Sequence, residues 1–409
     1  MYIIIVLSLL FGYQPQNTHS NSSTTIAYVD GQVWNGEKFI ERTLFISDGK
    51  FIEEPSRIDS TVNLNGKYIL PPFGDAHTHN LGVGGISKQI AKNKYIENGV
   101  FYAADLTNPY SEIHQIRDWF KRDATLDVAF ANGGITSTGS HPTGAMERIF
   151  TDKEKITLDN LELENDAYWF FDTKNDVENK WPKFLEQKPD IVKIYLTYIA
   201  EGLKKDECYG LCPDVLKTVV DSAHSNGKEV FAHVNTVSDV NFALDARVDI
   251  LAHLPSGNDG ISVDQEEFWL DEKTIEKAGK RNITVIPTAS KLIEDTDPDT
   301  LKEEIARQRK QLHDLRKAGA QIALGADEWR KTVLFEAMYM HKYDIFNNAK
   351  LLNILSTTTP QSIFSNRKIG QLTKGYEGSF IALNCNPVEK FECVNDIYQG
   401  VKEGNKVIK

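Results

Sequence analysis

Basic residues are fewer than acidic ones in this sequence, and no segment is rich in lysine or arginine. Its 409 residues include 46 Lys and Arg against 58 Asp and Glu, which gives a formal net charge of −12. Non-specific binding to nucleic acid or to an anionic membrane relies on basic patches. The lack of such patches argues against both of these partners.

Long apolar runs are also scarce, and the run at the N-terminus is too short to span a bilayer. This run, MYIIIVLSLLFGYQ, is followed by polar NTHSNSSTT. The pattern is typical of a secretory signal peptide, although a basic start and a small-x-small cleavage site are missing; a frayed apolar terminus is the alternative. We expect residues 1–23 to be a leader, the protein to be exported to the periplasm or the extracellular space, and no integral membrane domain to follow.

Cysteine is rare, and the four cysteines fall into two close pairs. Cys208 lies near Cys212, and Cys385 lies near Cys393. In an exported protein each pair can close a local disulfide across a turn or a hairpin. A zinc site at the CxxxC pair is the weaker alternative, because no second cysteine pair or histidine lies near it in sequence.

The two ends of the mature chain are predicted to be rich in β-structure. Residues 25–65 contain short alternating runs broken by Asp-Gly and Asn-Gly turns, and residues 369–409 have the same character. The segment between them has a different pattern. We therefore expect one small β-sandwich domain assembled from residues 24–68 and 367–409.

Between these ends, eight short apolar runs alternate with amphipathic helical segments. This alternation is typical of parallel βα units, and eight units predict an α/β fold with a TIM (β/α)8 barrel over residues 69–366. The connection of residues 137–190 is too long for an ordinary βα loop, so we expect it to hold extra helix and a lid. The predicted strands lie within ILPPFGDAHTH, GVFYAADLT, DVAFANGGI, DIVKIYLT, EVFAHVNT, DILAHLP, ITVIPTA and QIALGAD.

Histidines mark the ends of three of these strands, where a TIM barrel builds its active site. His77 and His79 are two residues apart, so on a strand they project from the same face and can hold one metal ion. Such a pair alone is a weak signal, since two satisfied polar residues at an exposed strand end have the same pattern. His233 and His253 lie at the ends of the fifth and sixth predicted strands.

Lys193 stands in the middle of the fourth predicted strand, where burial of an unpaired ammonium is costly. The ordinary solution is a strand edge whose lysine reaches water. Alternation instead places Lys193, Tyr195 and Thr197 on the face that points into the barrel. A desolvated, neutral amine there can add carbon dioxide and become a carbamate, an anionic ligand whose two oxygens can bridge two divalent ions.

Asp327 adds a carboxylate at the end of the last predicted strand. Mixed imidazole and carboxylate ligands suit zinc, with iron or manganese as substitutes. Four histidines, one lysine and one aspartate at strand ends together predict a metal centre. The predicted ligands are His77, His79, Lys193, His233, His253 and Asp327.

These features, in this order, resemble the amidohydrolase superfamily of metal-dependent hydrolases. The resemblance covers residues 27–407, and it is greatest to the branch of imidazolonepropionases and of carboxylated-lysine, prolidase-like Xaa-Pro and Xaa-Arg dipeptidases. PPFGD departs from the usual Pro-Gly-Leu-Ile/Val-Asp entry but keeps Asp75, which we expect to support the turn into the barrel. Gly-Ala-Asp replaces the usual Gly-Thr/Ser-Asp at the last strand. The matching segments are PPFGDAHTH, IVKIYLT, FAHVNT, LAHLP, ALGADE and IGQLTKGYEGSFIAL.

The resemblance implies a binuclear centre. The two histidines of the first strand and Asp327 would bind the more buried ion, and the histidines of the fifth and sixth strands the more exposed one. Carboxylated Lys193 and a hydroxide would bridge the ions. The hydroxide would attack an amide C–N bond, with Asp327 as general base and then acid, and His253 among the catalytic groups. The implied cofactors are two divalent ions, zinc first, and carboxylation of Lys193 by CO2.

Four residues are expected to contact substrate. His141 follows the third strand on a loop over the barrel mouth, where it can contact substrate or stabilise an oxyanion, or else hold a turn. Tyr195, Tyr198 and Asn235 are expected in the pocket from their positions at strand ends. Trp329, close to Asp327, can wall the pocket or take a packing role.

A dipeptide or an N-acyl amino acid is the small-molecule substrate class that the resemblance favours. In the alternative, a mononuclear enzyme like an imidazolonepropionase or a deaminase acts on a cyclic amide or amidine, and Lys193 is structural or contacts substrate. Lactones and phosphotriesters stay open, because the same hydroxide attacks ester carbon or phosphorus. A non-catalytic interaction module is disfavoured because every ligand position is filled. Members of the family are often homo-oligomers.

Overall fold

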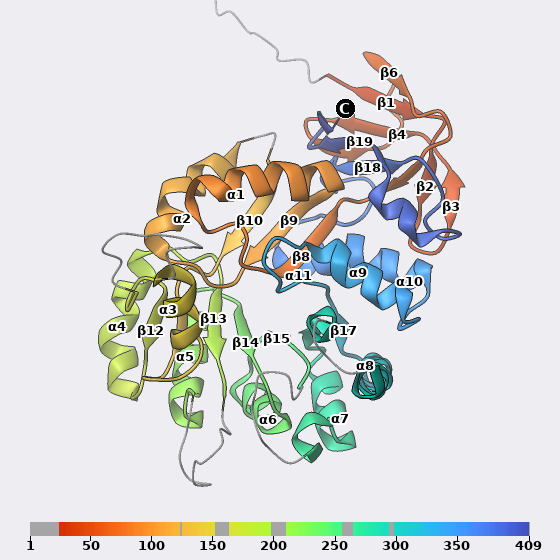
Figure 1. The fold of residues 1–409 in the computed structure, drawn as a ribbon. Helices are drawn as coiled ribbons and strands as arrows, with labels where there is room; N and C mark the ends of the chain where they lie inside the picture. The colour runs from red at the N-terminus through yellow and green to blue at the C-terminus, as the bar shows by residue number, and fades with distance from the viewer. Residues whose placement is uncertain are drawn as a thin grey trace, which may run out of the picture.

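The structure is a computed structural model that describes residues 24–122, 125–151, 163–197, 210–255, 265–293 and 298–408. Strands from the two ends of the chain lie together on one side of the molecule, and the middle of the chain forms the larger body beside them (Figure 1). Among the helices in these ranges, none is both long enough and apolar enough to cross a membrane.

Two β-sheets are assembled from the N-terminal and C-terminal parts of the chain. One has the strand order β5-β4-β1-β6, and the other joins both ends of the chain in the order β20-β19-β18-β7-β2-β3. Val33, Phe51 and Phe380 belong to one apolar cluster that both sheets share. The strands are β1 (Ile26–Val29), β2 (Gln32–Trp34), β3 (Phe39–Glu41), β4 (Leu44–Ser47), β5 (Lys50–Ile52), β6 (Ser60–Asn63), β7 (Tyr68–Leu70), β18 (Phe380–Leu383), β19 (Ile397–Lys402) and β20 (Asn405–Ile408).

Turn residues at the predicted positions connect these strands. Asp48 and Gly49 form the two-residue loop between β4 and β5, with φ of +49° and +70°. Asn65 and Gly66 have φ of +50° and +71° between β6 and β7. Positive φ at both positions is the signature of the tight turns that Asp-Gly and Asn-Gly favour, and the predicted turns at these two positions are confirmed; the first closes the hairpin of β4 and β5, and the second leads from one sheet to the other.

Parallel strands form the barrel, and each of the eight predicted runs contains one. The barrel strands belong to two hydrogen-bonded sheets. Backbone hydrogen bonds join these two sheets at both ends, since Ala76 N–H donates to Leu324 O at 2.8 Å and Asp190 N–H donates to Phe130 O at 2.8 Å. The TIM (β/α)8 barrel with a small β-sandwich built from both termini is confirmed. Its strands are β8 (Phe73–Thr78), β9 (Val100–Asp105), β10 (Asp127–Phe130) with β11 (Gly134–Thr136), β13 (Val192–Tyr195), β14 (Val230–His233), β15 (Ile250–Ala252), β16 (Thr284–Ile286) and β17 (Gln321–Ile322).

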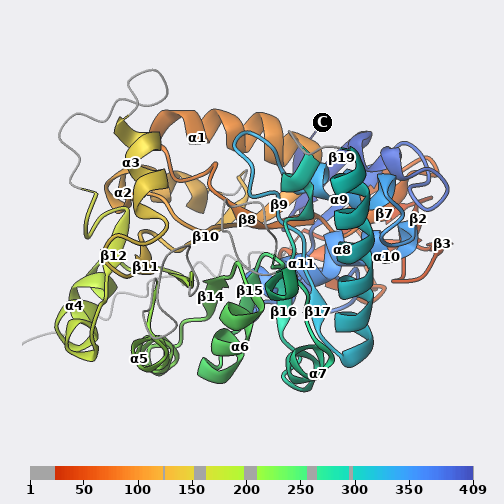
Figure 2. The same cartoon turned by 60° about the horizontal axis from the view of Figure 1, so that its bottom comes forward.

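Helices follow the barrel strands and lie on the outside of the barrel (Figure 2). Thr173 and Thr236 begin α4 and α6 through capping boxes. The connection of residues 137–190 holds α3 and β12 before α4, which confirms the expected extra helix; its residues 152–162 lie outside the described ranges. The helices are α1 (Gly84–Ile90), α2 (Tyr110–Ile116), α3 (Thr143–Thr151), α4 (Lys174–Glu186), α5 (Pro213–Ser225), α6 (Val237–Ala246), α7 (Glu272–Lys280), α8 (Pro298–Ala318), α9 (Val333–Lys342), α10 (Asn348–Asn353) and α11 (Thr359–Ile363).

Several short elements complete the described chain. β12 (Tyr168–Phe170) pairs with β11 in parallel, on the side away from β13. The others are single turns of 3₁₀ or π helix. They are η1 (Ala91–Tyr95), η2 (Ile96–Asn98), η3 (Arg117–Lys121), η5 (Gln265–Phe268), η6 (Ala289–Ile293), η7 (Ile354–Thr358) and η8 (Phe391–Asn395).

One of the two predicted disulfides lies within the described residues. Cys385 and Cys393 are joined across a Cα–Cα distance of 5.5 Å, which confirms that pairing. The other predicted pair includes Cys208, which lies outside the described residues.

Charged side chains tie the C-terminal strands to the start of β10. Lys402 on β19 is buried, and its Nζ lies 2.5 Å from Asp127 Oδ1. Arg367 lies 2.8 Å from the other oxygen of Asp127 and 2.5 Å from Glu377 Oε2. Each charge has an opposite partner, as burial of ions requires. The cluster joins the barrel to the β-sandwich at the amino ends of the barrel strands.

We expect Lys402→Met to lower the free energy of unfolding by about 1–3 kcal/mol, because it removes a buried ion-pair partner and leaves half-buried Asp127 with one cationic partner in place of two. Urea denaturation followed by tryptophan fluorescence measures the change. Lys121→Met is the matched control, since Lys121 pairs with Asp118 on the surface and its loss should leave stability unchanged within error. Equal stability of the Lys402→Met variant and the wild type would contradict a structural role for this cluster.

Candidate active site

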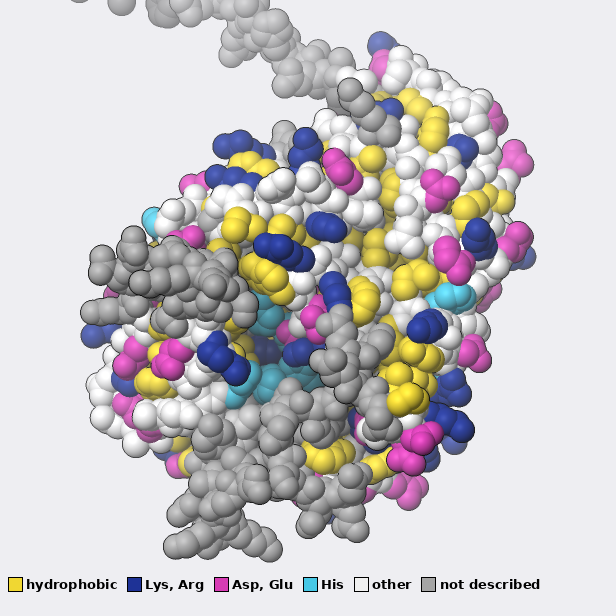
Figure 3. Space-filling model, viewed as in Figure 1, with side chains coloured by type: hydrophobic (Ala, Val, Ile, Leu, Met, Phe, Trp, Pro, Cys, Tyr) yellow, Lys and Arg dark blue, Asp and Glu magenta, His cyan; other side chains and the backbone are white. Residues whose placement is uncertain are grey.

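A pocket of about 570 Å³ opens at the carboxyl ends of the barrel strands. Figure 3 shows it as a hollow in which histidine side chains gather. Its lining combines predicted metal ligands with an apolar wall from α3. The lining residues are His77, His79, Val83, Thr107, Asn108, His141, Pro142, Ala145, Met146, Ile149, Phe150, Lys193, Tyr195, His233, His253, Lys291, Asp327, Trp329 and Arg330.

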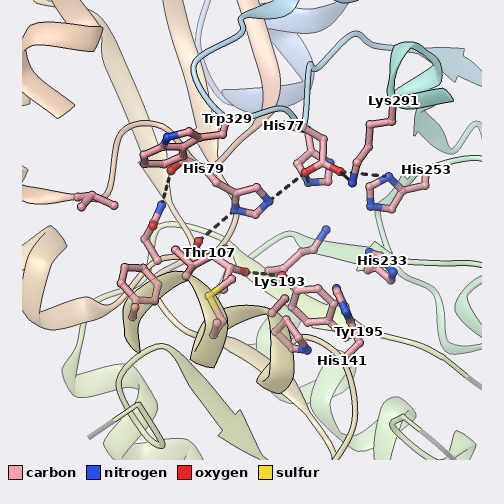
Figure 4. A pocket seen from close by; sticks show the side chains of 18 of the residues that line it. His77, His79, Thr107, His141, Lys193, Tyr195, His233, His253, Lys291 and Trp329 are labelled. Carbon is pink, nitrogen blue, oxygen red and sulfur yellow. Dashed lines mark hydrogen bonds and ion pairs between the residues drawn. The ribbon is translucent and has the colours of Figure 1, made fainter. Parts of the chain in front are cut away.

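The first and last barrel strands bring three predicted ligands together. The Nε2 atoms of His77 and His79 lie 3.2 Å and 3.1 Å from Asp327 Oδ1 (Figure 4). The backbones also meet here, because Asp327 N–H donates to His77 O at 2.9 Å. Gly325 permits this approach, since a Cβ at that position would lie 2.5 Å from the Cβ of His77.

Strained backbone marks the ends of the sixth, seventh and eighth barrel strands. His253, Thr288 and Asp327 have φ of +83°, +44° and +49°. This conformation is unfavourable for residues with a Cβ, and most of all for a β-branched threonine. The side chains of these residues meet, with His253 Nδ1 2.6 Å from Thr288 Oγ1 and 3.8 Å from Asp327 Oδ2. Strain of this kind concentrates at functional sites.

Aromatic rings form a second group beside these carboxylate contacts. The His233 ring on β14 lies 4.5 Å from the ring of His253 and 5.2 Å from that of Tyr195. His141 stacks on His233 with 4.8 Å between ring centroids. The structure thus places His141 in the pocket. Tyr195 is held by a 2.7 Å hydrogen bond between its hydroxyl and Thr107 Oγ1.

Lys193 lies beneath these rings and is almost fully buried, with 1% of its surface exposed. Its Nζ has no hydrogen-bond partner among the described residues, and neither has the buried Nδ1 of His77. Burial lowers the pKa of Lys193 to about 7, so a neutral amine is accessible near physiological pH. Unpartnered buried nitrogens require an explanation such as a modification or an ion that completes the site.

Burial keeps the imidazoles of the pocket neutral. It lowers the pKa of His77 to about 3 and that of His141 to about 4, and it holds the pKa of His233 and His253 well below the usual range. Neutral imidazole is the form that binds metal. His79 Nδ1 lies 3.0 Å from Thr107 O, so Nδ1 carries the ring proton and donates it to this carbonyl. Nε2 then has the lone pair that a metal ion requires.

Asp327 is the anionic centre of the group. Burial alone would raise its pKa, but the close contacts of its carboxylate with His77 and His79 and the positive charge of Lys291 hold the pKa well below the usual range. Donor atoms of His77, His253 and Asp327 lie within 4.8 Å of one another, as close as the donors of a metal centre lie. The neutral imidazoles and the anionic carboxylate together make a donor set of the type that binds divalent metal ions.

Two predicted substrate contacts do not belong to the described pocket. Asn235 is buried and is not part of the lining; its backbone N–H donates to Asp239 Oδ2 at 2.9 Å, in the cap of α6. Directly after β14 the chain turns into α6, and contact of Asn235 with substrate stays a prediction. Tyr198 lies outside the described residues. Trp329 lines the pocket and is 40% exposed, so it walls the mouth and does not pack in the core.

Sequence reasoning missed Lys291 and the apolar face of α3. Lys291 lies on η6, after the seventh barrel strand, with its Nζ 2.6 Å from Asp327 Oδ2. Its position soon after a barrel strand was the only available signal. Pro142, Met146 and Ile149 reach the pocket from the long connection after β11. Nothing in the sequence pattern of a connection that long indicates which face it presents to the barrel.

Asp75 supports the site from behind and does not line the pocket. Its carboxylate accepts hydrogen bonds from the backbone N–H groups of His77 at 3.3 Å, Ala326 at 3.4 Å and Val333 at 3.0 Å, and from the Tyr95 hydroxyl at 3.3 Å. Its support therefore extends beyond the turn into the barrel, where a supporting role was expected. Asp75 joins β8 to the segment after β17 that carries Asp327.

The sequence of residues 68–409 matches the amidohydrolase family. The chain belongs to this family. No protein with a curated description matches this chain. Family membership confirms the predicted superfamily and makes the protein a hydrolase that acts on carbon–nitrogen bonds. Members of the family generally bind divalent metal ions and act on small substrates.

Solved structures share the fold of this amidohydrolase at low sequence identity. The ochratoxinase of A. niger has a TM-score of 0.73 and 17% identity, over 94% of this chain and 95% of that one. A Xaa-Pro dipeptidase with bound methionine has a TM-score of 0.70 and 16% identity, over 94% and 100% of the two chains. Molinate hydrolase has a TM-score of 0.67 and 18% identity, over 94% of each chain.

We expect Asp75→Asn to lower the free energy of unfolding by about 1–3 kcal/mol, because one amide oxygen cannot accept all the hydrogen bonds that the buried carboxylate accepts. Urea denaturation of the two proteins side by side measures the difference. Asp118→Asn, at an exposed surface carboxylate, is the matched control and should leave the unfolding midpoint unchanged. An unchanged midpoint in Asp75→Asn would show that the seam between β8 and the segment after β17 does not depend on this carboxylate.

Proposed function

We propose that the protein is a binuclear metal-dependent amidohydrolase that cleaves an amide bond in a dipeptide or an N-acyl amino acid. The observation that carries this proposal is the buried Nζ of Lys193, which lacks a hydrogen-bond partner among the described residues and lies in a pocket of histidines. A mononuclear site needs no lysine at that position. A carbamate on Lys193 would satisfy the buried nitrogen and supply the bridging ligand.

Carboxylation of Lys193 requires only carbon dioxide. The neutral Nζ attacks the carbon of CO2, one C–N bond forms, and one proton leaves the nitrogen. The product is a carbamate anion with two oxygens. Burial supports this reaction, because it lowers the pKa of Lys193 to about 7 and so leaves a substantial neutral fraction near physiological pH.

The other ligands fall into two groups around this bridge. His77, His79 and Asp327 would hold one ion, since both Nε2 atoms point at the same carboxylate oxygen. His233 and His253, with 4.5 Å between their rings, would hold the other. Zinc is the first choice for such nitrogen and oxygen donors, with manganese or iron as substitutes.

Residues of the chain would carry the proton transfers and orient the substrate. Divalent ions at the site would acidify water and polarise the substrate carbonyl. Asp327, anionic in this pocket, would accept a proton and return it to the leaving nitrogen. His141 would donate a hydrogen bond to the developing oxyanion, because stacking on His233 fixes its ring and burial keeps its pKa at about 4, so that the ring is neutral.

The names of similar structures support a peptide-like substrate. One is a Xaa-Pro dipeptidase with bound methionine, and another is a prolidase complexed with N-methylphosphonate-L-proline, with a TM-score of 0.71. At 16% identity both structures share the fold of this chain.

We also propose that the protein is exported. The N-terminal apolar run lies outside the described residues, and the proposal rests on its sequence pattern together with the Cys385–Cys393 disulfide. Disulfides persist in oxidising compartments and are rare in the cytosol. Fractionation of cells that express the full chain tests this proposal, and recovery in the cytosol with the apolar run intact would contradict it.

Metal analysis of the purified protein should find two ions per chain after growth with zinc or manganese and bicarbonate. Lys193→Ala should retain one ion or fewer and lose activity by roughly 100-fold or more, because the bridge is removed. Added acetate should restore part of the activity by filling the space with a free carboxylate. Lys310→Ala, at an exposed ion pair on α8, is the matched control. One ion per wild-type chain would overturn the bridge and favour the mononuclear alternative.

A panel of dipeptides, N-acyl amino acids, lactones and phosphotriesters identifies the bond that is cleaved. We expect hydrolysis of dipeptides or N-acyl amino acids to exceed that of the other classes in kcat/KM, and chelation followed by dialysis to abolish it. Re-addition of zinc or manganese should restore it. Preferred cleavage of a lactone or a phosphotriester would overturn the proposed substrate class.

A further inference from the structure

The pocket contains a lysine that none of the proposed chemical steps uses. Lys291 on η6 has 41% of its side chain exposed, and its Nζ lies 2.6 Å from Asp327 Oδ2. An ammonium has three donor hydrogens, so Lys291 can bind a second anionic group while it contacts Asp327. Figure 4 shows Lys291 beside His253, with His141 across the pocket.

Buried contacts fix the short helix that carries Lys291. Glu336 on α9 is fully buried, and its two oxygens accept hydrogen bonds from the backbone N–H groups of Ala289 and Ser290, both at 2.8 Å. Gln308 on α8 donates to Ala289 O at 3.4 Å and accepts from the Tyr339 hydroxyl at 2.7 Å. η6 is therefore anchored by two helices before any substrate arrives, which lowers the entropic cost of binding.

The charge of the pocket is opposite to that of the molecule. Apart from Lys193, whose amine can be neutral, the charged lining residues are the cationic Lys291 and Arg330 and one anion, Asp327. The whole chain carries a net charge of −12. Two divalent ions would add more positive charge than a carbamate on Lys193 would remove. A positive cleft in a negative protein concentrates anionic ligands at the site.

The other wall of the pocket is apolar and partly open to solvent. Pro142, Ala145, Met146 and Ile149 line it from α3 and the residue before it, and Trp329 lines the mouth. Ile149 and Trp329 are 38% and 40% exposed, and they are two of the five large hydrophobic residues that are exposed in the described ranges. Exposed apolar side chains gathered at a cleft mark a binding surface.

We propose that Lys291 is the receptor for a carboxylate of the substrate, and that the wall of α3 and Trp329 receives a large apolar group of the same molecule. The inference rests on the proposed function, and it narrows the substrate class to amides that carry both a free carboxylate and an aromatic or branched aliphatic group. The two subsites lie on either side of the candidate ligands, so a substrate that spans them places its amide bond beside Asp327 and His141. Lys291 then acts as a specificity-determining residue.

Binding of two matched ligands to the zinc-loaded protein tests the role of Lys291. Calorimetry should show that the wild type binds 3-phenylpropanoate roughly tenfold to hundredfold more tightly than 3-phenylpropanamide, because a charge-assisted hydrogen bond is lost with the amide. Lys291→Met should abolish this preference, and Lys291→Arg should restore most of it. Lys310→Met, on the surface of α8, should keep the wild-type preference.

A wild type without any preference for the carboxylate would overturn the proposal. So would a preference that Lys291→Met retains, since the carboxylate would then bind elsewhere, for example on a metal ion. Kinetics give a second measure, because the ratio of kcat/KM for N-acetyl-L-phenylalanine to that for its carboxamide should fall in Lys291→Met by the same factor. Failure to cleave any amide, with Lys291-dependent carboxylate binding intact, would overturn the proposed function alone.

The apolar subsite has its own test. Ile149→Ser should weaken binding of 3-phenylpropanoate by roughly threefold to tenfold, because apolar contact area is lost, and should leave binding of propanoate unchanged. Ile86→Ser is the matched control, because Ile86 is exposed on α1 and does not line the pocket. Equal weakening of both ligands by Ile149→Ser, or no weakening of either, would overturn the assignment of this wall.

Discussion

The seam between the first and last barrel strands is the constraint on which the site depends. At this seam Asp327 N–H donates to the carbonyl of His77, and the backbones approach closely enough that only glycine fits at position 325. Asp75 reinforces the seam from behind by accepting backbone hydrogen bonds from Ala326 and Val333. Because the ends of the barrel meet here, two histidines and a carboxylate that are about 250 residues apart in sequence share one point in space. The other candidate ligands reach the site from β13, β14 and the end of β15.

The molecule separates stability from chemistry along the barrel axis. At the amino ends of the strands, Lys402 and Arg367 neutralise Asp127 and join the β-sandwich to the barrel. At the carboxyl ends, burial keeps imidazoles neutral and leaves the Lys193 amine without a partner in the described chain. The same low-polarity interior therefore demands paired charges at one end and produces reactive, uncharged nitrogens at the other. The strained backbone at His253 lies at the carboxyl ends of the strands, where it positions the imidazole and lowers stability.

Much of the fold was predictable because its signals are local. Apolar runs that alternate with helical segments identify barrel strands, and Asp48–Gly49 identifies a hairpin from two letters. The candidate ligands were predictable for the same reason, since each stands at the end of a run and period-two alternation gives the face of Lys193. Asn235 follows β14 as expected, but its backbone N–H also donates to Asp239 in the cap of α6, a contact that strand position does not predict.

The sequence by itself determined the strands, the polar residues at their ends and the turn chemistry, because these depend on neighbours a few residues apart. Only the tertiary structure decided that Lys291 reaches Asp327, because η6 is oriented by Glu336 and Gln308 from two distant helices. It also decided which face of α3 lines the pocket and that Asp75 joins the seam. Contacts of this kind depend on how separate elements pack, and no pattern within one element encodes them.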